Sequence, residues 1–163
     1  SLAIAAYLDR AFEGPQLIPA TAKEAAEVYR WISIVNAYVF PVMNRFMKER
    51  LVRPRWGGTA DKDFIVSAQE PLTKQVQLIQ RAASAGGFVA GNKLTLADSF
   101  LLPHLLFFAL SPEGEALLRQ APAATDWLER MKARPSFKTS MMSLAYDAFR
   151  QLPPPDAPAW PSS

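Results

Sequence analysis

Few side chains in this sequence can carry chemistry, and His104 is the first to consider. The chain contains no cysteine and one histidine, so it holds no thiol nucleophile, no disulfide and no cluster of thiolate or imidazole ligands for a metal. His104 follows Pro103 in a run of leucines, and no paired carboxylate or nucleophile lies near it in the sequence. We therefore expect a structural histidine and no metal site.

A second group of chemically useful side chains shares one stripe of an expected helix. From Thr21 to Leu51, apolar residues recur at steps of three and four, which places them on one face of a long helix that Pro41 should kink or divide. This apolar face consists of Val28, Ile32, Val35, Val39, Val42 and Phe46. A second stripe, on a different side of the helix from the apolar face, consists of Tyr29, Ser33, Asn36 and Phe40.

Hydroxyl and carboxyl side chains also mark where helices begin. Thr21 with Glu24, and Thr95 with Asp98, have the spacing of a capping box, in which each side chain accepts from the backbone amide of the other residue. Ser111 precedes a proline, as an N-cap residue often does. We expect a helix to begin at each of these places.

The rest of the chain shows the same helical periodicity. No segment alternates with period two between turn signals, and no internal repeat is evident, so the expected fold class is all-α. A proline-rich tail follows over residues 151–163. The further helices are expected over residues 61–84 with an interruption at Pro71, and over residues 96–110, 112–120, 123–132 and 136–150.

Composition and charge limit the possible classes of protein. The chain has 163 residues, of which 50% are apolar, enough for one domain core. Its net charge is only +3 and its basic residues alternate with acids, which argues against a nucleic-acid partner. No apolar run approaches the roughly 20 residues of a membrane span, and the first residues lack the basic segment of a signal peptide. We expect a cytoplasmic protein without membrane contact.

Three stretches of the chain have patterns that are characteristic of a single protein family. Residues 88–98 read FVAGNKLTLAD, residues 122–137 read PAATDWLERMKARPSF, and residues 1–8 read SLAIAAYL. Each is similar to a characteristic segment of the cytosolic glutathione transferases. One departure is Ser99, which stands where the family carries an aliphatic residue that packs against Leu94.

The resemblance implies a helical bundle of the glutathione-transferase C-terminal type at residues 13–150. Residues 1–12 would then be the last helix of a thioredoxin-like domain that otherwise lies before Ser1. The implied function is the C-terminal part of a glutathione transferase, which conjugates the cosubstrate glutathione to a small hydrophobic electrophile, and the implied assembly is a homodimer. The alternative is a non-catalytic module of the same fold that binds a ligand or another protein.

The resemblance also suggests site residues. Ser1 matches a serine that holds the γ-glutamyl carboxylate of glutathione at a helix N-terminus, although it could be a simple N-cap. The residue that ionises the thiol lies before Ser1 in the family, so no catalytic residue is expected in this segment. Trp160 either covers the pocket mouth or belongs to a loose extension. The long helix supplies one pocket wall, for which the candidates are Tyr29, Ser33, Asn36 and Phe40, unless this stripe is exposed or faces a second subunit.

Overall fold

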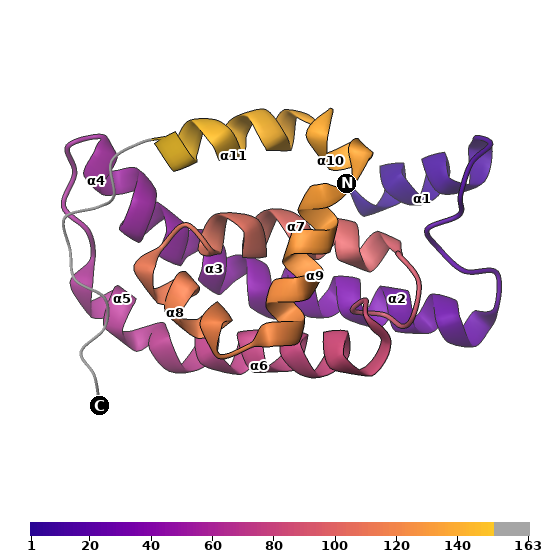
Figure 1. Ribbon diagram of the computed structural model, residues 1–163, viewed down its shortest axis with the longest axis horizontal. Coiled ribbons are helices and arrows are strands. Elements are labelled where there is room, and N and C mark those ends of the chain that lie inside the picture. Colours follow the sequence, from indigo (N-terminus) through magenta and orange to yellow (C-terminus); the bar gives the residue numbers. More distant parts are fainter. Residues whose placement is uncertain (152–163) are drawn as a thin grey trace.

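The computed structural model describes residues 1–151, and these residues form a bundle of helices (Figure 1). They contain no β-strand, only one isolated antiparallel bridge between Phe88 and Gly91. The all-α fold class expected from the sequence is therefore confirmed. The expectation for Trp160 falls outside the described residues. The principal helices are α1 (Leu2–Ala11), α2 (Ala22–Ile34), α3 (Phe40–Met47), α5 (Lys62–Ser67), α6 (Gln69–Gly86), α7 (Leu96–Phe108), α8 (Pro112–Arg119), α9 (Pro122–Ala133), α10 (Pro135–Lys138) and α11 (Met141–Gln151).

The long helix exists and continues through Pro41. Two π-helical segments, η1 (Val35–Val39) and η2 (Lys48–Val52), join α2 to α3 and α3 to α4 (Arg53–Arg55), so the helical path ends at Arg55 and not at Leu51. A proline cannot donate to the helix and its ring crowds the carbonyl one turn back. The wider π turn immediately before Pro41 relieves this clash without ending the helix.

The apolar face of the long helix forms the centre of the core, with one change of register. Five of its six expected positions are buried, but Val42 is only half-buried and Met43 is buried in its place. The reason is η1, since a π turn contains more residues than an α turn and rotates the residues that follow it. Figure 1 shows α7 at the centre of the bundle, where it packs against α2 and α3, while α6 packs against α9.

Two expected helices differ from the prediction in where, or whether, they are divided. The interruption in residues 61–84 lies at Ala68, between α5 and α6, and not at Pro71. Pro71 falls in the first turn of α6, where its missing amide costs no hydrogen bond. The expected helix 136–150 is split into α10 and α11, because the Ser140 hydroxyl accepts from the Ser143 amide at 3.4 Å and starts a new helix.

Helix α1 stands beside the bundle and contributes no buried residue. The carboxylate of Asp9 accepts from the backbone amides of Leu17 and Ile18, which fixes α1 to the connecting segment. The carbonyl of Leu17 in turn accepts from the amide of Leu96 at 2.9 Å, the first residue of α7. These contacts join the C-terminal half of α1 to the start of α7, while Ser1, at the other end of α1, shares a cavity with residues from the middle of α7. Within residues 1–151, no helix is both long and apolar enough to cross a membrane.

Candidate functional site

A buried carboxylate fixes the start of α7, the helix that carries His104. The expected capping box is present, with Asp98 Oδ2 accepting from the Thr95 amide at 2.9 Å. The other oxygen of Asp98 accepts from the amide of Val89 at 3.0 Å and from the indole Nε1 of Trp127 at 2.8 Å. The carboxylate therefore joins the preceding loop, α7 and α9, and it sets the position of everything farther along α7.

Two adjoining cavities lie beside the middle of α7, and they share Pro103 and His104. We call the larger one the N-terminal cavity, of about 500 Å³, and the other the methionine cavity, of about 410 Å³. The N-terminal cavity is lined by Ser1, Asn36, Phe40, Ser99, Phe100, Pro103 and His104. The methionine cavity is lined by Met43, Asn44, Met47, Lys48, Val52, Pro103, His104, Phe107 and Phe149.

Three helices position the walls of the methionine cavity. Met43 and Met47 are one turn apart on α3, and Phe107 lies one turn beyond Pro103 on α7, so each pair presents neighbouring side chains. From α11, the ring of Phe149 meets that of Phe107 edge to face, with centroids 5.5 Å apart. Aromatic rings and thioether side chains give this cavity a mainly apolar and polarizable lining, suited to a small aromatic molecule.

His104 has a place in the site that the sequence did not suggest. Its ring lies 5.3 Å from the ring of Phe40, between the two cavities. Burial lowers the pKa of His104 below its ordinary value, because desolvation disfavours the imidazolium. A neutral imidazole both donates and accepts a hydrogen bond. The one signal available in the sequence was its spacing, one helical turn from both Phe100 and Phe107, which places all three on one face of α7.

Some of the residues expected to form the site line one of the two cavities, and others do not. Ser1, Asn36 and Phe40 come together around the N-terminal cavity, although each of them is also exposed, as the alternative for this stripe expected of Asn36 and Phe40. Tyr29 and Ser33 are exposed and line neither this cavity nor the methionine cavity, and the Ser33 hydroxyl donates to the Tyr29 carbonyl at 2.9 Å. The side chain of Ser1 makes no capping hydrogen bond, so it does not serve as a side-chain cap of α1.

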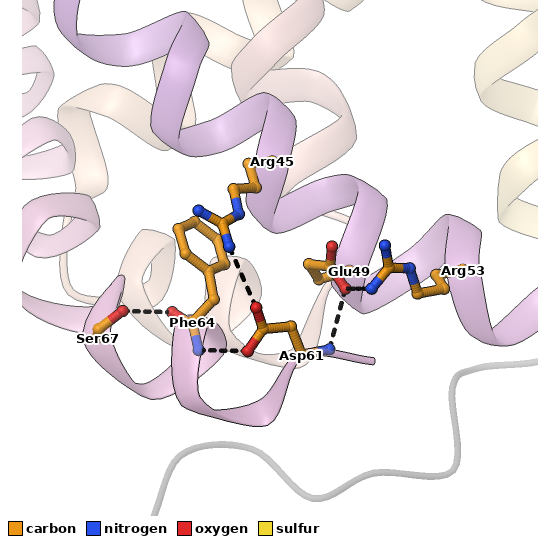
Figure 2. Close-up of polar contacts among 6 residues, drawn as sticks. All are labelled: Arg45, Glu49, Arg53, Asp61, Phe64 and Ser67. Atoms are coloured by element: carbon orange, nitrogen blue, oxygen red, sulfur yellow. Dashed lines mark hydrogen bonds and ion pairs between the residues drawn. The ribbon is translucent and has the colours of Figure 1, made fainter. Parts of the chain in front are cut away.

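Charged side chains on another face of the same helical path contact one another, and none of them lines either cavity (Figure 2). Arg45 Nη2 lies 3.1 Å from Asp61 Oδ2, and Glu49 Oε2 lies 2.9 Å from Arg53 Nη1. Glu49 Oε2 also accepts from the amide of Asp61 at 2.9 Å. The amide of Phe64 and then Arg45 lower the pKa of Asp61. This cluster fixes α3 and α4 to the start of α5.

Known proteins are similar to this chain in sequence. The sequence profile of the glutathione S-transferase C-terminal domain matches residues 30–135. Glutathione S-transferase 3 of Zea mays is 30% identical over 147 residues, which are 89% of this chain and 62% of that protein. Glutathione S-transferase F14 of Arabidopsis thaliana is 26% identical over 145 residues, 86% of this chain and 57% of that protein. The chain thus spans less than two thirds of the length of these relatives.

Solved structures agree with this assignment. Glutathione S-transferase III in its apo form superposes with a TM-score of 0.76 at 30% identity, covering 94% of this chain and 68% of that one. Glutathione S-transferase I bound to lactoylglutathione superposes with a TM-score of 0.77 at 25% identity, covering 91% of this chain and 68% of that one. The resemblance drawn from the three sequence stretches is confirmed, and the chain belongs to the glutathione S-transferase family, with the C-terminal domain of that family at residues 30–135.

Proposed function

We propose that this chain supplies the electrophile-binding part of an enzyme that conjugates glutathione to small apolar electrophiles. The observation that supports this most is the pair of adjoining cavities that meet at His104. One has Ser1 at its edge and the other has an apolar lining. A relative, glutathione S-transferase I, has been solved in complex with an atrazine glutathione conjugate. That ligand combines a glutathione part with a compact aromatic part, the two kinds of group that the two cavities would receive.

Each part of the site has a separate task in this proposal. The N-terminus of α1, with Ser1, offers amide donors and a positive dipole end to a carboxylate of glutathione. Met43, Met47 and Phe107 hold the electrophile and exclude water from it. Neutral His104 and the amide of Asn36 orient its polar substituents. In conjugation, the glutathione sulfur forms a bond to the electrophilic carbon while a leaving group departs with its electron pair. We assign no residue of this chain to ionisation of the thiol.

We also propose that the protein acts in the cytoplasm as a homodimer. The absence of cysteine fits a reducing compartment. Ile4 and Tyr7 on α1 are each 67% exposed and Phe12, directly after it, is 65% exposed, an apolar surface that fits contact with further protein. The measurement that tests the assembly is the mass of the protein in solution by light scattering.

Conjugation of glutathione to chlorodinitrobenzene tests the proposed activity. We suggest a chimera that joins this chain to the part of Zea mays glutathione S-transferase 3 that it does not match. The chimera should show turnover, whereas the 163-residue chain alone should not exceed the uncatalysed rate. A chimera that unfolds cooperatively and binds glutathione without turnover would favour the non-catalytic binding module. Turnover by the 163-residue chain alone would show that it contains a thiol-activating residue of its own.

A further inference from the structure

One cation at the methionine cavity has no counter-ion among residues 1–151. Lys48 lines this cavity at the junction of α3 and η2, and its ammonium takes part in no ion pair or hydrogen bond of the described part of the chain. Every other charged side chain between residues 45 and 55 has a partner. These contacts are Arg45 with Asp61, Glu49 with Arg53, Arg50 with buried Glu113 at 3.0 Å, and Arg55 with the carbonyl of Leu51 at 2.6 Å.

The geometry of the helix explains why the Lys48 side chain has no acidic partner among the described residues. Arg45, Glu49 and Arg53 are spaced by four on one face, where Arg45 and Glu49 contact Asp61 and Arg53 contacts Glu49, as Figure 2 shows. Lys48 shares its own face with Asn44 and Val52, which are also spaced by four and line the cavity. The positions one turn before and after Lys48 hold no acid, and the carboxylate of the adjacent Glu49 pairs with Arg53. Its ammonium is therefore available to a molecule inside the cavity.

The described residues that line this cavity carry no negative charge. None of its nine lining residues is an aspartate or glutamate. His104 is neutral at physiological pH, since its burial lowers its pKa. From outside, the guanidinium of Arg55 approaches the ring of Phe149 at 5.9 Å, which adds a second cation near the cavity. The cavity therefore combines an apolar interior with a positive edge.

We propose that the methionine cavity selects aromatic ligands that carry an anionic group, such as a carboxylate or a sulfonate, and that Lys48 pairs with this group. The inference rests on the proposed function, because it names the class of electrophile that the same site would take. The aromatic body would lie among Met43, Met47 and Phe107, while the anionic group would stay at the solvent edge. Because Lys48 is exposed, the pair should raise affinity about two- to five-fold, as for other exposed ion pairs.

Two fluorescent probes that differ by one charged group test this proposal on the full chain. Anilinonaphthalene sulfonate carries the anion, and phenylnaphthylamine has the same aromatic rings without it. Lys48→Met should weaken binding of the sulfonate about two- to five-fold and leave binding of the neutral probe unchanged. Lys48→Arg should retain the preference. The matched control is Lys62→Met, since Lys62 is exposed on α5 and lines neither cavity.

The outcomes separate this proposal from the proposed function. If the neutral probe binds and Lys48→Met leaves the affinity for the sulfonate unchanged, the anionic preference is wrong while the apolar site stands. If Lys48→Met weakens both probes equally, Lys48 acts through the fold and not through charge, which also overturns the preference. If neither probe binds the chain, the apolar site and the preference both fail. Loss of the preference at high salt would support the ion pair.

Discussion

Removal of the Asp98 carboxylate should destabilise the fold far more than loss of an ordinary helix cap. Asp98 is fully buried and accepts from the amides of Val89 and Thr95, the hydroxyl of Thr95 and the indole of Trp127, at distances from 2.8 to 3.0 Å. The hydroxyl can rotate to another acceptor, but two amides and the indole cannot. Asp98→Ala therefore leaves three buried donors without a partner.

The size of the effect follows from these three donors. An unsatisfied buried donor costs about 1–3 kcal/mol, so Asp98→Ala should lower the free energy of unfolding by about 3 kcal/mol or more. Thr95→Ala should cost only about 1 kcal/mol, the usual value of a cap oxygen. Trp127→Phe removes one hydrogen bond to a charged acceptor and should cost about 2 kcal/mol. Since a domain of this size has about 5–15 kcal/mol of stability, all three variants should still fold.

Urea unfolding followed by far-ultraviolet circular dichroism measures these values. In a double-mutant cycle, Asp98→Ala combined with Trp127→Phe should cost about 1–2 kcal/mol less than the sum of the single changes, because both remove the same hydrogen bond. The combination with Thr95→Ala should also be less than additive. Strictly additive losses, or a cost of Asp98→Ala below about 1 kcal/mol, would refute the idea that one carboxylate joins the three segments. If Asp98→Ala fails to fold, Asp98→Asn gives the same comparison with one acceptor retained.

Three further predictions concern the site and its support. Burial lowers the pKa of His104 in the folded state, so the unfolded chain binds more protons at mildly acidic pH. Stability should therefore fall as the pH drops from about 7.5 to 5.5. Thermal melts of His104→Gln over the same range should show a smaller fall in stability than those of the unchanged chain. In the chimera, Asn36→Ala should change the Michaelis constant for some electrophiles without loss of stability. Ser33→Ala, the control, should change neither the Michaelis constant nor the stability. Identical kinetics for both variants would remove Asn36 from the pocket. Gly114→Ala should destabilise the fold by about 2 kcal/mol in urea unfolding, because its Cβ would lie 1.9 Å from the carbonyl oxygen of Phe108.

Local sequence signals predicted most of the helices and their caps. Thr21 and Ser111 begin helices as expected, because an N-cap depends on residues within one turn of it. The break between α5 and α6 was predicted at Pro71, because proline usually interrupts a helix, but it lies at Ala68. Pro71 falls in the first turn of α6, where it is tolerated. The two π segments were not predicted. Each ends two residues before a proline, Pro41 or Pro54, but the sequence pattern alone did not show that the helix passes these prolines through a wider turn.

The candidate site was predictable only in part, since it is made by distant segments. The stripe from Tyr29 to Phe40 could be read from helical spacing, but which half of it meets α7 and Ser1 depends on tertiary packing. His104 looked structural because its neighbours in sequence are leucines, whereas its neighbours in space include Phe40 and Met43. The bond from Trp127 to Asp98 crosses 29 residues and likewise had no local signal.

The most direct test of the central claim is where a small apolar molecule binds. The chain has five methionines, and nuclear magnetic resonance of their carbon-13-labelled methyl groups reports binding at each one. On addition of neutral phenylnaphthylamine, the signals of Met43 and Met47 should shift together, while that of Met131, which lies in the core beside a different cavity, should stay in place. Shifts at Met131 without shifts at Met43 and Met47 would contradict the claim that the methionine cavity is the binding site.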